Sequence, residues 1–283
     1  MTLRYETLSL LSDYGHADEF VGVVHSVVRS ISAVEIIDIT HNIPAFDIRA
    51  GGLAIARAAQ FLRPGVVVAV VDPGAGTERR AVAVEVGDGQ SVLVGPDNGL
   101  LAPAVALVGG ATRAVELTNT DLHLAEGDAV IDAGRDVFAP VAAHLCNGVP
   151  FEDLGTIIDA NTLQPGVLPV SEREGDMLTC EVLWVDRFGN VQLNVDADDV
   201  ADMGSDLLVR TDAATRGVRR VSSFGEITGG SIGLMVDSYG LMALAVARGS
   251  AANELSIAEG ARVTFEAGDA PRQVTPVELG RRG

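Results

Sequence analysis

Positive charge is scarce in this chain of 283 residues. Acidic residues number 39 against 20 basic ones, so the formal net charge is -19, and the basic residues form only short pairs such as Arg79-Arg80 and Arg219-Arg220. Nucleic acid and anionic membrane surfaces bind basic patches, so we expect neither as a partner. The negative charge is compatible with a cationic substrate, although it more often only keeps a protein in solution.

Cysteine and long apolar runs are also scarce. Cys146 and Cys180 lie in apolar contexts without a CxxC motif or a Cys/His ligand spacing, so we expect reduced core residues of a cytoplasmic protein and no bound metal. A disulfide between the two is the alternative. The chain starts without a basic, apolar leader, and no apolar run approaches the ~18 residues that a membrane span needs, which predicts a soluble, unprocessed protein.

The first part of the chain, residues 1–165, alternates apolar strands with amphipathic helices. This order predicts an α/β domain whose mostly parallel sheet is flanked by helices. The expected strand segments are 7–13, 34–40, 65–72, 81–86 and 91–101, and the expected helices are 19–32, 48–62 and 136–148.

The pattern changes after about residue 170. Strand-like runs separated by Gly, Asp and Ser fill residues 172–283, with no long helix between them, which predicts a smaller all-β domain. Two domains also suit the chain's length and its 47% hydrophobic content. We expect the tail from residue 268 onward to be partly disordered.

Aspartates follow two of the apolar strands of the first domain. Asp13 and Asp72 each end such a strand with glycine two residues later, and the carboxyl ends of parallel strands form the usual ligand-binding rim. A turn or a helix cap is an equally good explanation for either aspartate alone. Asp97-Asn98-Gly99 similarly forms a favourable β-turn, and Asp136 is expected to cap the helix that follows it.

The second domain contains the run VDRFGNVQLN, residues 185–194. Phe188 beside the amides of Asn190 and Asn194 suits a purine, because the ring stacks while an amide reads the base edge. A plain hairpin with Phe188 in the core is the alternative. These residues alone therefore indicate a two-domain protein with an acidic inter-domain site of a kind that suits a nucleoside.

Seven motifs together resemble one known family. In chain order they are LLSDYG, IIDITHNIPAFDIRAG, VAVVDPGAGTERR, VGPDNGLL, GRDVFAPVAAHL, VDRFGNVQLN and DSYGLMALAVARGSAA. Their collinear order is similar to that of the S-adenosylmethionine hydroxide adenosyltransferase family, whose members are adenosine-forming S-adenosylmethionine hydrolases related to the fluorinase and chlorinase. The resemblance implies an α/β domain followed by an antiparallel, β-barrel-like domain.

The resemblance also implies an assembly and a set of contacts. It implies homotrimers with active sites between the first domain of one subunit and the second domain of its neighbour, with S-adenosylmethionine as substrate and no cofactor. The implied substrate contacts are Asp13 for the ribose hydroxyls, Phe46 around the sugar and sulfonium, Asn98 in the PDNG turn, Phe188 and Asn190 with backbone near Arg248 for adenine, and Asp186 and Ser238 for the methionine end.

The implied chemistry uses Asp72 and Arg79. A sulfonium already makes methionine a good leaving group, so the ribose 5′ carbon needs only an aligned nucleophile. Asp72 would orient a water or take its proton, and Arg79 would stabilise hydroxide character. A halide beside a fixed carboxylate would be repelled, which favours water over halogenation.

One position departs from the family pattern. The hydrolases typically read FHGRD where this chain reads DAGRD, so Ala133 stands at the place of a catalytic histidine and Asp132 at that of the preceding aromatic residue. Three explanations remain open: Asp132 or His123 substitutes, hydrolysis is slow, or the substrate differs. The competing functions are therefore a hydrolase, a halogenase, or a nucleoside-binding protein without turnover.

Overall fold

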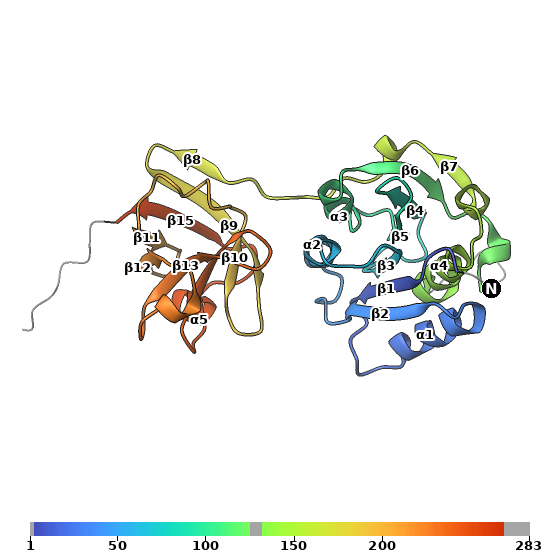
Figure 1. The fold of residues 1–283 in the computed structure, drawn as a ribbon, viewed down its shortest axis with the longest axis horizontal. Helices are drawn as coiled ribbons and strands as arrows, with labels where there is room; N and C mark the ends of the chain where they lie inside the picture. Colours follow the sequence, from blue (N-terminus) through green and yellow to red (C-terminus); the bar gives the residue numbers. More distant parts are fainter. Residues whose placement is uncertain (1–2, 125–131, 269–283) are drawn as a thin grey trace, which may run out of the picture. The chain divides into compact units, whose positions relative to one another are not determined.

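The computed structural model describes residues 3–124 and 132–268, and the chain divides into two compact units, Met1–Leu168 and Pro169–Gly283 (Figure 1). Each unit is described by itself below. Residues 269–283 of the tail expected to be disordered lie outside the described residues. None of the helices within the described ranges is long and apolar enough to cross a membrane.

The first unit is built on a mixed sheet. Four neighbouring strands run parallel: β2 (Glu35–Thr40), β1 (Thr7–Ser12), β3 (Val66–Val70) and β5 (Ser91–Pro96). The sheet continues through three antiparallel strands: β4 (Ala81–Val86), β6 (Ala111–Glu116) and β7 (Thr156–Ile158). The predicted α/β fold is thus confirmed, and its parallel character belongs to the half of the sheet that carries Asp13 and Asp72.

Helices cover both faces of this sheet. On one face α1 (Phe20–Ile31) packs against α4 (Ala139–Cys146), and on the other α2 (Ile48–Ala59) packs against α3 (Ala102–Leu107) (Figure 1). Strand β3 serves both faces, since its even-numbered valines join the core under α1 and α4 while Val67 and Ala69 join the core under α2. Burial on both sides explains why β3 reads as a continuous apolar run rather than an alternating one.

The second unit is a mixed, mostly antiparallel β-barrel, as predicted. Its strands follow the order β10 (Val191–Leu193), β14 (Met242–Val246), β13 (Ile232–Val236), β12 (Thr215–Arg220), β11 (Asp206–Arg210), β15 (Arg262–Ala267) and β9 (Met177–Val185). Pairing of β9 with β10 closes the barrel, while β8 (Glu172–Glu174) extends it from β9. A short helix, α5 (Ala251–Leu255), packs on β14.

The two cysteines are free and buried, one in each unit, as predicted. Burial raises the pKa of each thiol to about 12, so neither is a reactive thiolate at neutral pH.

Two phenylalanines of the barrel unit give a test of its core. Phe265 on β15 is fully buried, whereas Phe188 is 71% exposed, so the alternative in which Phe188 belongs to the core is wrong. Phe265→Ala should lower the free energy of unfolding by about 3–5 kcal/mol, because it leaves a cavity. Phe188→Ala should change it by less than about 0.5 kcal/mol. Urea unfolding followed by the fluorescence of Trp184, the single tryptophan, reports on this unit; equal losses in the two variants would contradict the barrel core.

Candidate active site

The carboxyl ends of β1 and β3 meet at one rim of the first unit. The backbone N–H of Asp13 donates to the carbonyl of Val70 at 3.2 Å, which ties the two strand ends together. Asp72 lies two residues beyond β3, in the turn that Pro73 and Gly74 continue. The rim predicted from the strand pattern therefore exists, as parallel strands require.

Asp72 and Arg79 form a buried ion pair at this rim. Their side chains are only 6% and 13% exposed, and Arg79 Nη2 donates to Asp72 Oδ2. The guanidinium is held in place by a second hydrogen bond, from Nη1 to the carbonyl of Arg80 at 2.9 Å, and by the Phe138 ring, whose centroid lies 5.5 Å away. Asp72 Oδ1 is buried and has no hydrogen-bond partner among the described residues, so its acceptor capacity is unused.

The protonation of Asp72 is set by two opposing effects. Burial raises the pKa of this carboxyl above its ordinary value, although the charge and hydrogen bond of Arg79 act in the opposite direction. The Gly74 N–H also favours the ionised form, but it is not aligned with Oδ1 well enough to satisfy it. A carboxylate of raised pKa is a better proton acceptor than a free one.

Tyr14 joins Asp132 to the rim. Its hydroxyl donates to Asp132 Oδ1 at 2.8 Å, and the backbone N–H of Arg135 donates to the same oxygen at 3.1 Å. Burial, followed by the negative charges of Asp132, Asp13 and Asp72, raises the pKa of Tyr14 well above its usual range, so the phenol stays protonated. A side chain at Gly134 would place its Cβ 2.1 Å from the Tyr14 hydroxyl oxygen, which explains the glycine.

The sequence reading missed Tyr14, although the signal was present. Tyr14 directly follows Asp13 in the LLSDYG motif, and the glycine of GRD makes room for its hydroxyl.

The GRD segment differs from the expected helix cap. Gly134–Phe138 forms a π-helical turn, which often marks a functional site, and Asp136 lies within it. Its carboxylate is buried and takes two hydrogen bonds from Arg135, at 2.6 and 2.8 Å, so the expectation that Asp136 caps the following helix is wrong. Ala133 is 5% exposed and packs in the core.

His123, the other possible substitute for the histidine, follows a 3₁₀ turn after β6. Its Nε2 is buried and has no hydrogen-bond partner within residues 3–124 and 132–268, and burial lowers the pKa of the ring.

Asp13 and Phe46 are brought together. Asp13 Oδ2 accepts the backbone N–H of Phe46 at 2.9 Å. Phe46 is 70% exposed and has a φ of 68°, a left-handed conformation that costs a non-glycine residue of order 1 kcal/mol or more. The hydrogen bond from Asp13 helps to hold this strained residue at the rim.

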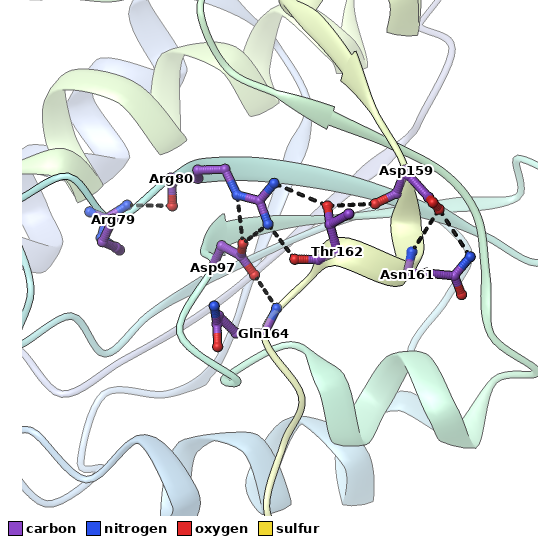
Figure 2. Close-up of polar contacts among 7 residues, drawn as sticks. All are labelled: Arg79, Arg80, Asp97, Asp159, Asn161, Thr162 and Gln164. Atoms are coloured by element: carbon purple, nitrogen blue, oxygen red, sulfur yellow. Dashed lines mark hydrogen bonds and ion pairs between the residues drawn. The ribbon is translucent and has the colours of Figure 1, made fainter.

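A second arginine–aspartate pair serves the structure of the rim (Figure 2). Arg80 donates to Asp97 Oδ2 and to the carbonyl of Thr162, while the N–H of Gln164 donates to Asp97 Oδ1 at 2.7 Å. Both oxygens of Asp97 therefore accept hydrogen bonds, whereas only Oδ2 of Asp72 does so among the described residues. The neighbouring Asn98 donates to the carbonyl of Val71 and accepts the N–H of Leu100, so its side chain braces the turn that carries Asp72.

The barrel unit has its own pocket, of about 350 Å³. Four of the predicted contacts line it together: Asp186, Phe188, Asn190 and Ser238. Arg248 does not line the pocket; it lies beyond β14 with a φ of 56°.

Two similar loops border this pocket. Asp186 Oδ1 accepts the N–H groups of Phe188 and Asn190 at 2.8 and 2.9 Å, and Asp186 Oδ2 accepts the side-chain amide of Asn190 at 2.7 Å. Asp237 Oδ1 likewise accepts the N–H groups two and four residues later, at 2.8 and 3.2 Å. Each aspartate thus organises an Asp-x-aromatic-Gly loop that presents its aromatic ring, Phe188 or Tyr239, to the pocket.

The sequence reading found the first loop and missed most of the second. DRFG and DSYG repeat the same spacing, and this repetition was the available signal. Gln192, which donates to Asp237 Oδ2 at 2.5 Å, was also missed, because β10 and β14 pair in the sheet although they lie far apart in the sequence.

The chain combines an α/β unit that contains a buried aspartate–arginine pair with a barrel unit that contains an aromatic pocket. Comparison with known proteins identifies the class that has this combination. The family model described as the SAM hydroxide adenosyltransferase N-terminal domain matches residues 8–155, and that of the C-terminal domain matches residues 180–264. The chain belongs to the SAM hydroxide adenosyltransferase family.

Individual relatives agree with this assignment. The chain is 43% identical over 262 residues, 92% of its length and 98% of the relative's, to the (R)-S-adenosyl-L-methionine hydrolase of Salinispora tropica. It is 25% identical over 222 residues, 70% of its length and 74% of the relative's, to a fluorinase of an Actinoplanes species. A crystal structure of an uncharacterized conserved protein from Thermotoga maritima matches 91% of this chain and 99% of that one with a TM-score of 0.85 at 31% identity.

The Asp72–Arg79 pair gives a direct test by titration. Arg79→Met removes the cation that favours the ionised carboxylate, so the pKa of Asp72, already raised by burial, should rise further. Carbon-13 NMR of the Asp72 carboxyl through a pH titration measures this. Arg80→Met is the matched control, because Arg80 pairs with Asp97, and it should leave the Asp72 midpoint in place. An unchanged midpoint in Arg79→Met would show that the pair does not control this carboxyl.

Proposed function

We propose that this protein hydrolyses (R)-S-adenosyl-L-methionine to adenosine and L-methionine. Its family and its relative at 43% identity support this reaction. The observation that carries the proposal is the buried Asp72 Oδ1, which lacks a donor while Oδ2 is held by Arg79. A water hydrogen-bonded to Oδ1 would fill that vacant acceptor and have its own lone pair directed away from the carboxylate.

The reaction at this site is an in-line displacement. The water oxygen forms a bond to the ribose 5′ carbon as the bond from that carbon to sulfur breaks, and the electron pair of the broken bond neutralises the sulfonium. Asp72 accepts the water proton, either before the new carbon–oxygen bond forms or while it forms, and then releases the proton to solvent. Arg79 keeps the carboxylate oriented, and its charge stabilises hydroxide character in the attacking water.

Asp132 acts through Tyr14 in this proposal. Since the Tyr14 hydroxyl donates its hydrogen bond to Asp132, its oxygen keeps its lone pairs to accept a hydrogen bond from a water at the rim. Asp132 is then a positioning residue rather than a contact of the reacting atoms. This arrangement supplies a water-orienting group in a chain that has Ala133 where the family histidine stands.

The substrate's two ends use different groups. In the first unit, Asp13 contacts the ribose hydroxyls with Phe46 beside the sugar, and Asn98 contributes by bracing the Asp72 turn. In the barrel unit, Phe188 and Asn190 hold adenine with backbone near Arg248.

The methionine end is assigned to Asp186 and Ser238. Asp186 already accepts three hydrogen bonds, and a carboxylate offers about four acceptor sites, so it can take one N–H of the methionine ammonium.

Halogenation is the competing reaction, since a fluorinase is a relative. A halide at the water position would lie against the Asp72 carboxylate, and the low dielectric of a buried site strengthens their repulsion. Binding without turnover is the other alternative, and the intact Asp72–Arg79 pair argues against it.

Replacing Asp72 tests its role as proton acceptor. Asp72→Asn keeps the shape but cannot accept the proton, so we expect kcat to fall by about 10²–10⁴ while the affinity for adenosine changes little. Asp88→Asn is the matched control, an exposed carboxylate in a tight turn, and should keep full activity. Chromatography of adenosine release and calorimetry of adenosine binding give the two quantities. A loss of affinity without a loss of kcat would make Asp72 a substrate contact instead.

The assembly is a separate proposal. By its family we propose that the active molecule is a homotrimer, and its two buried free cysteines suit the reducing cytoplasm. Light scattering should give three times the mass of the chain or a multiple of that. An active species with the mass of a single chain would contradict it.

A further inference from the structure

A cluster of two histidines and an aspartate lies at the β2 edge of the first unit. His25 belongs to α1, Asp38 to β2, and His41 follows the end of β2. One ligand atom from each, a ring nitrogen of either histidine and a carboxylate oxygen, can be chosen so that all three lie within 4.8 Å of one another. No metal was expected from the sequence, because the two cysteines show no CxxC motif or Cys/His ligand spacing, and these three residues were not considered together.

A shift in strand register brings Asp38 and His41 to one side. Side chains three apart on a regular strand point to opposite faces. Between β1 and β2 the pairing passes from Leu10 with Asp38 to Leu11 with Thr40, so Ile39 is an extra residue in β2. Such a bulge re-aims the side chains that follow it, which lets His41 turn toward the Asp38 carboxylate.

His41 is prepared as a ligand. Its side chain is fully buried, and Nδ1 lies 2.7 Å from the Ser12 hydroxyl oxygen, a contact that fixes the ring as outer partners of metal-bound histidines do. Its Nε2 lies 3.0 Å from Asp38 Oδ1 but without the alignment of a hydrogen bond. Nε2 and the Asp38 carboxylate oxygen thus face each other, and a cation between them would bind both groups while the Ser12 hydroxyl stays at Nδ1.

The other two groups complete a suitable set. His25 Nε2 lies 2.9 Å from the same Asp38 oxygen. The Asp38 carboxylate oxygen therefore lies between the two imidazole nitrogens, 2.9 Å from one and 3.0 Å from the other. The side chains of His25 and Asp38 are 33% and 40% exposed, which leaves an approach for an ion and for a water ligand.

We propose that His25, Asp38 and His41 bind one divalent transition-metal ion of the zinc type. Two imidazole nitrogens and one carboxylate oxygen form a ligand set that Zn²⁺ accepts, whereas Ca²⁺ and Mg²⁺ prefer oxygen ligands alone. Metal–ligand bonds of about 2.0–2.2 Å in a tetrahedral site separate the ligand atoms by roughly 3.3 Å. The two distances to Asp38 therefore need to open by only a few tenths of an ångström.

The bound ion would act on the rim rather than on the reaction. The carbonyl of His41 accepts the N–H of Gly15 at 2.7 Å, and Ser12 contacts the His41 ring, so His41 holds both ends of the Asp13-Tyr14 segment. Fixing His41 with a metal stiffens that segment. The proposal does not depend on which substrate the rim binds.

Metal titration of the untagged, chelator-treated full chain tests this. Calorimetry with Zn²⁺ alone should give one ion per chain, and Co²⁺ should produce the intense visible absorption of a tetrahedral site. His25→Ala and Asp38→Asn should each weaken Zn²⁺ binding by more than about tenfold. Loss of a group that only hydrogen-bonds to a metal ligand already weakens metal binding by about 10- to 100-fold, so loss of a ligand should weaken it at least as much. His25→Ala should fold, because His25 is partly exposed on α1 and alanine is a strong helix former.

His144→Ala is the matched control, since His144 lies on α4, and it should bind Zn²⁺ like the parent. Zinc should also raise the Tm of the parent and of His144→Ala but not that of His25→Ala. Equal Zn²⁺ affinity in the parent and in His25→Ala, or a weak octahedral Co²⁺ spectrum in the parent, would overturn the proposal.

Discussion

The ion pair between Asp72 and Arg79 is the constraint on which the rim depends. A buried carboxylate needs a partner, and leaving it unpaired would cost several kcal/mol. Arg79 satisfies Oδ2 and is itself held by the Arg80 carbonyl and the Phe138 ring, so the carboxylate is fixed in place while Oδ1 has no donor among the described residues. In our proposal this single unsatisfied oxygen defines where the nucleophilic water lies, and the other rim groups are arranged around it.

The surrounding polar contacts separate structural from reactive carboxylates. Asp97 has both oxygens occupied by Arg80 and the Gln164 N–H, Asp136 is held by Arg135, and Asp186 organises its own loop. An aspartate therefore stabilises the local structure where neighbouring groups donate hydrogen bonds to both of its oxygens. It can accept a proton from water where one oxygen has no donor. Asp132 is intermediate, because its Oδ1 holds the Tyr14 hydroxyl and the Arg135 N–H together.

The local sequence pattern was enough to predict the fold class and the rim of the first unit. It was not enough to predict the side-chain contacts that determine what each rim residue does. The β-branched run before Asp72 required a buried strand, and the parallel order required Asp13 beside it. The pairing of Arg79 with Asp72 followed from resemblance, whereas the Tyr14–Asp132 hydrogen bond joins residues 118 apart and leaves no local signal. The π-helical turn at Gly134–Phe138 and the bulge at Ile39 are likewise set by tertiary packing, so Asp136 was misread as a cap and His41 was not connected with Asp38.

The central claim is that Asp72 directs a water to the ribose 5′ carbon and does not itself attack that carbon. A single turnover of excess enzyme with (R)-S-adenosyl-L-methionine in oxygen-18 water separates these cases by mass spectrometry of the product and of the peptide that contains Asp72. If Asp72 directs a water, oxygen-18 should appear in the 5′ hydroxyl of adenosine and none in the Asp72 carboxylate. Unlabelled adenosine together with oxygen-18 in the Asp72 carboxylate would show a covalent ester that water opens at its carbonyl carbon, and would contradict the account.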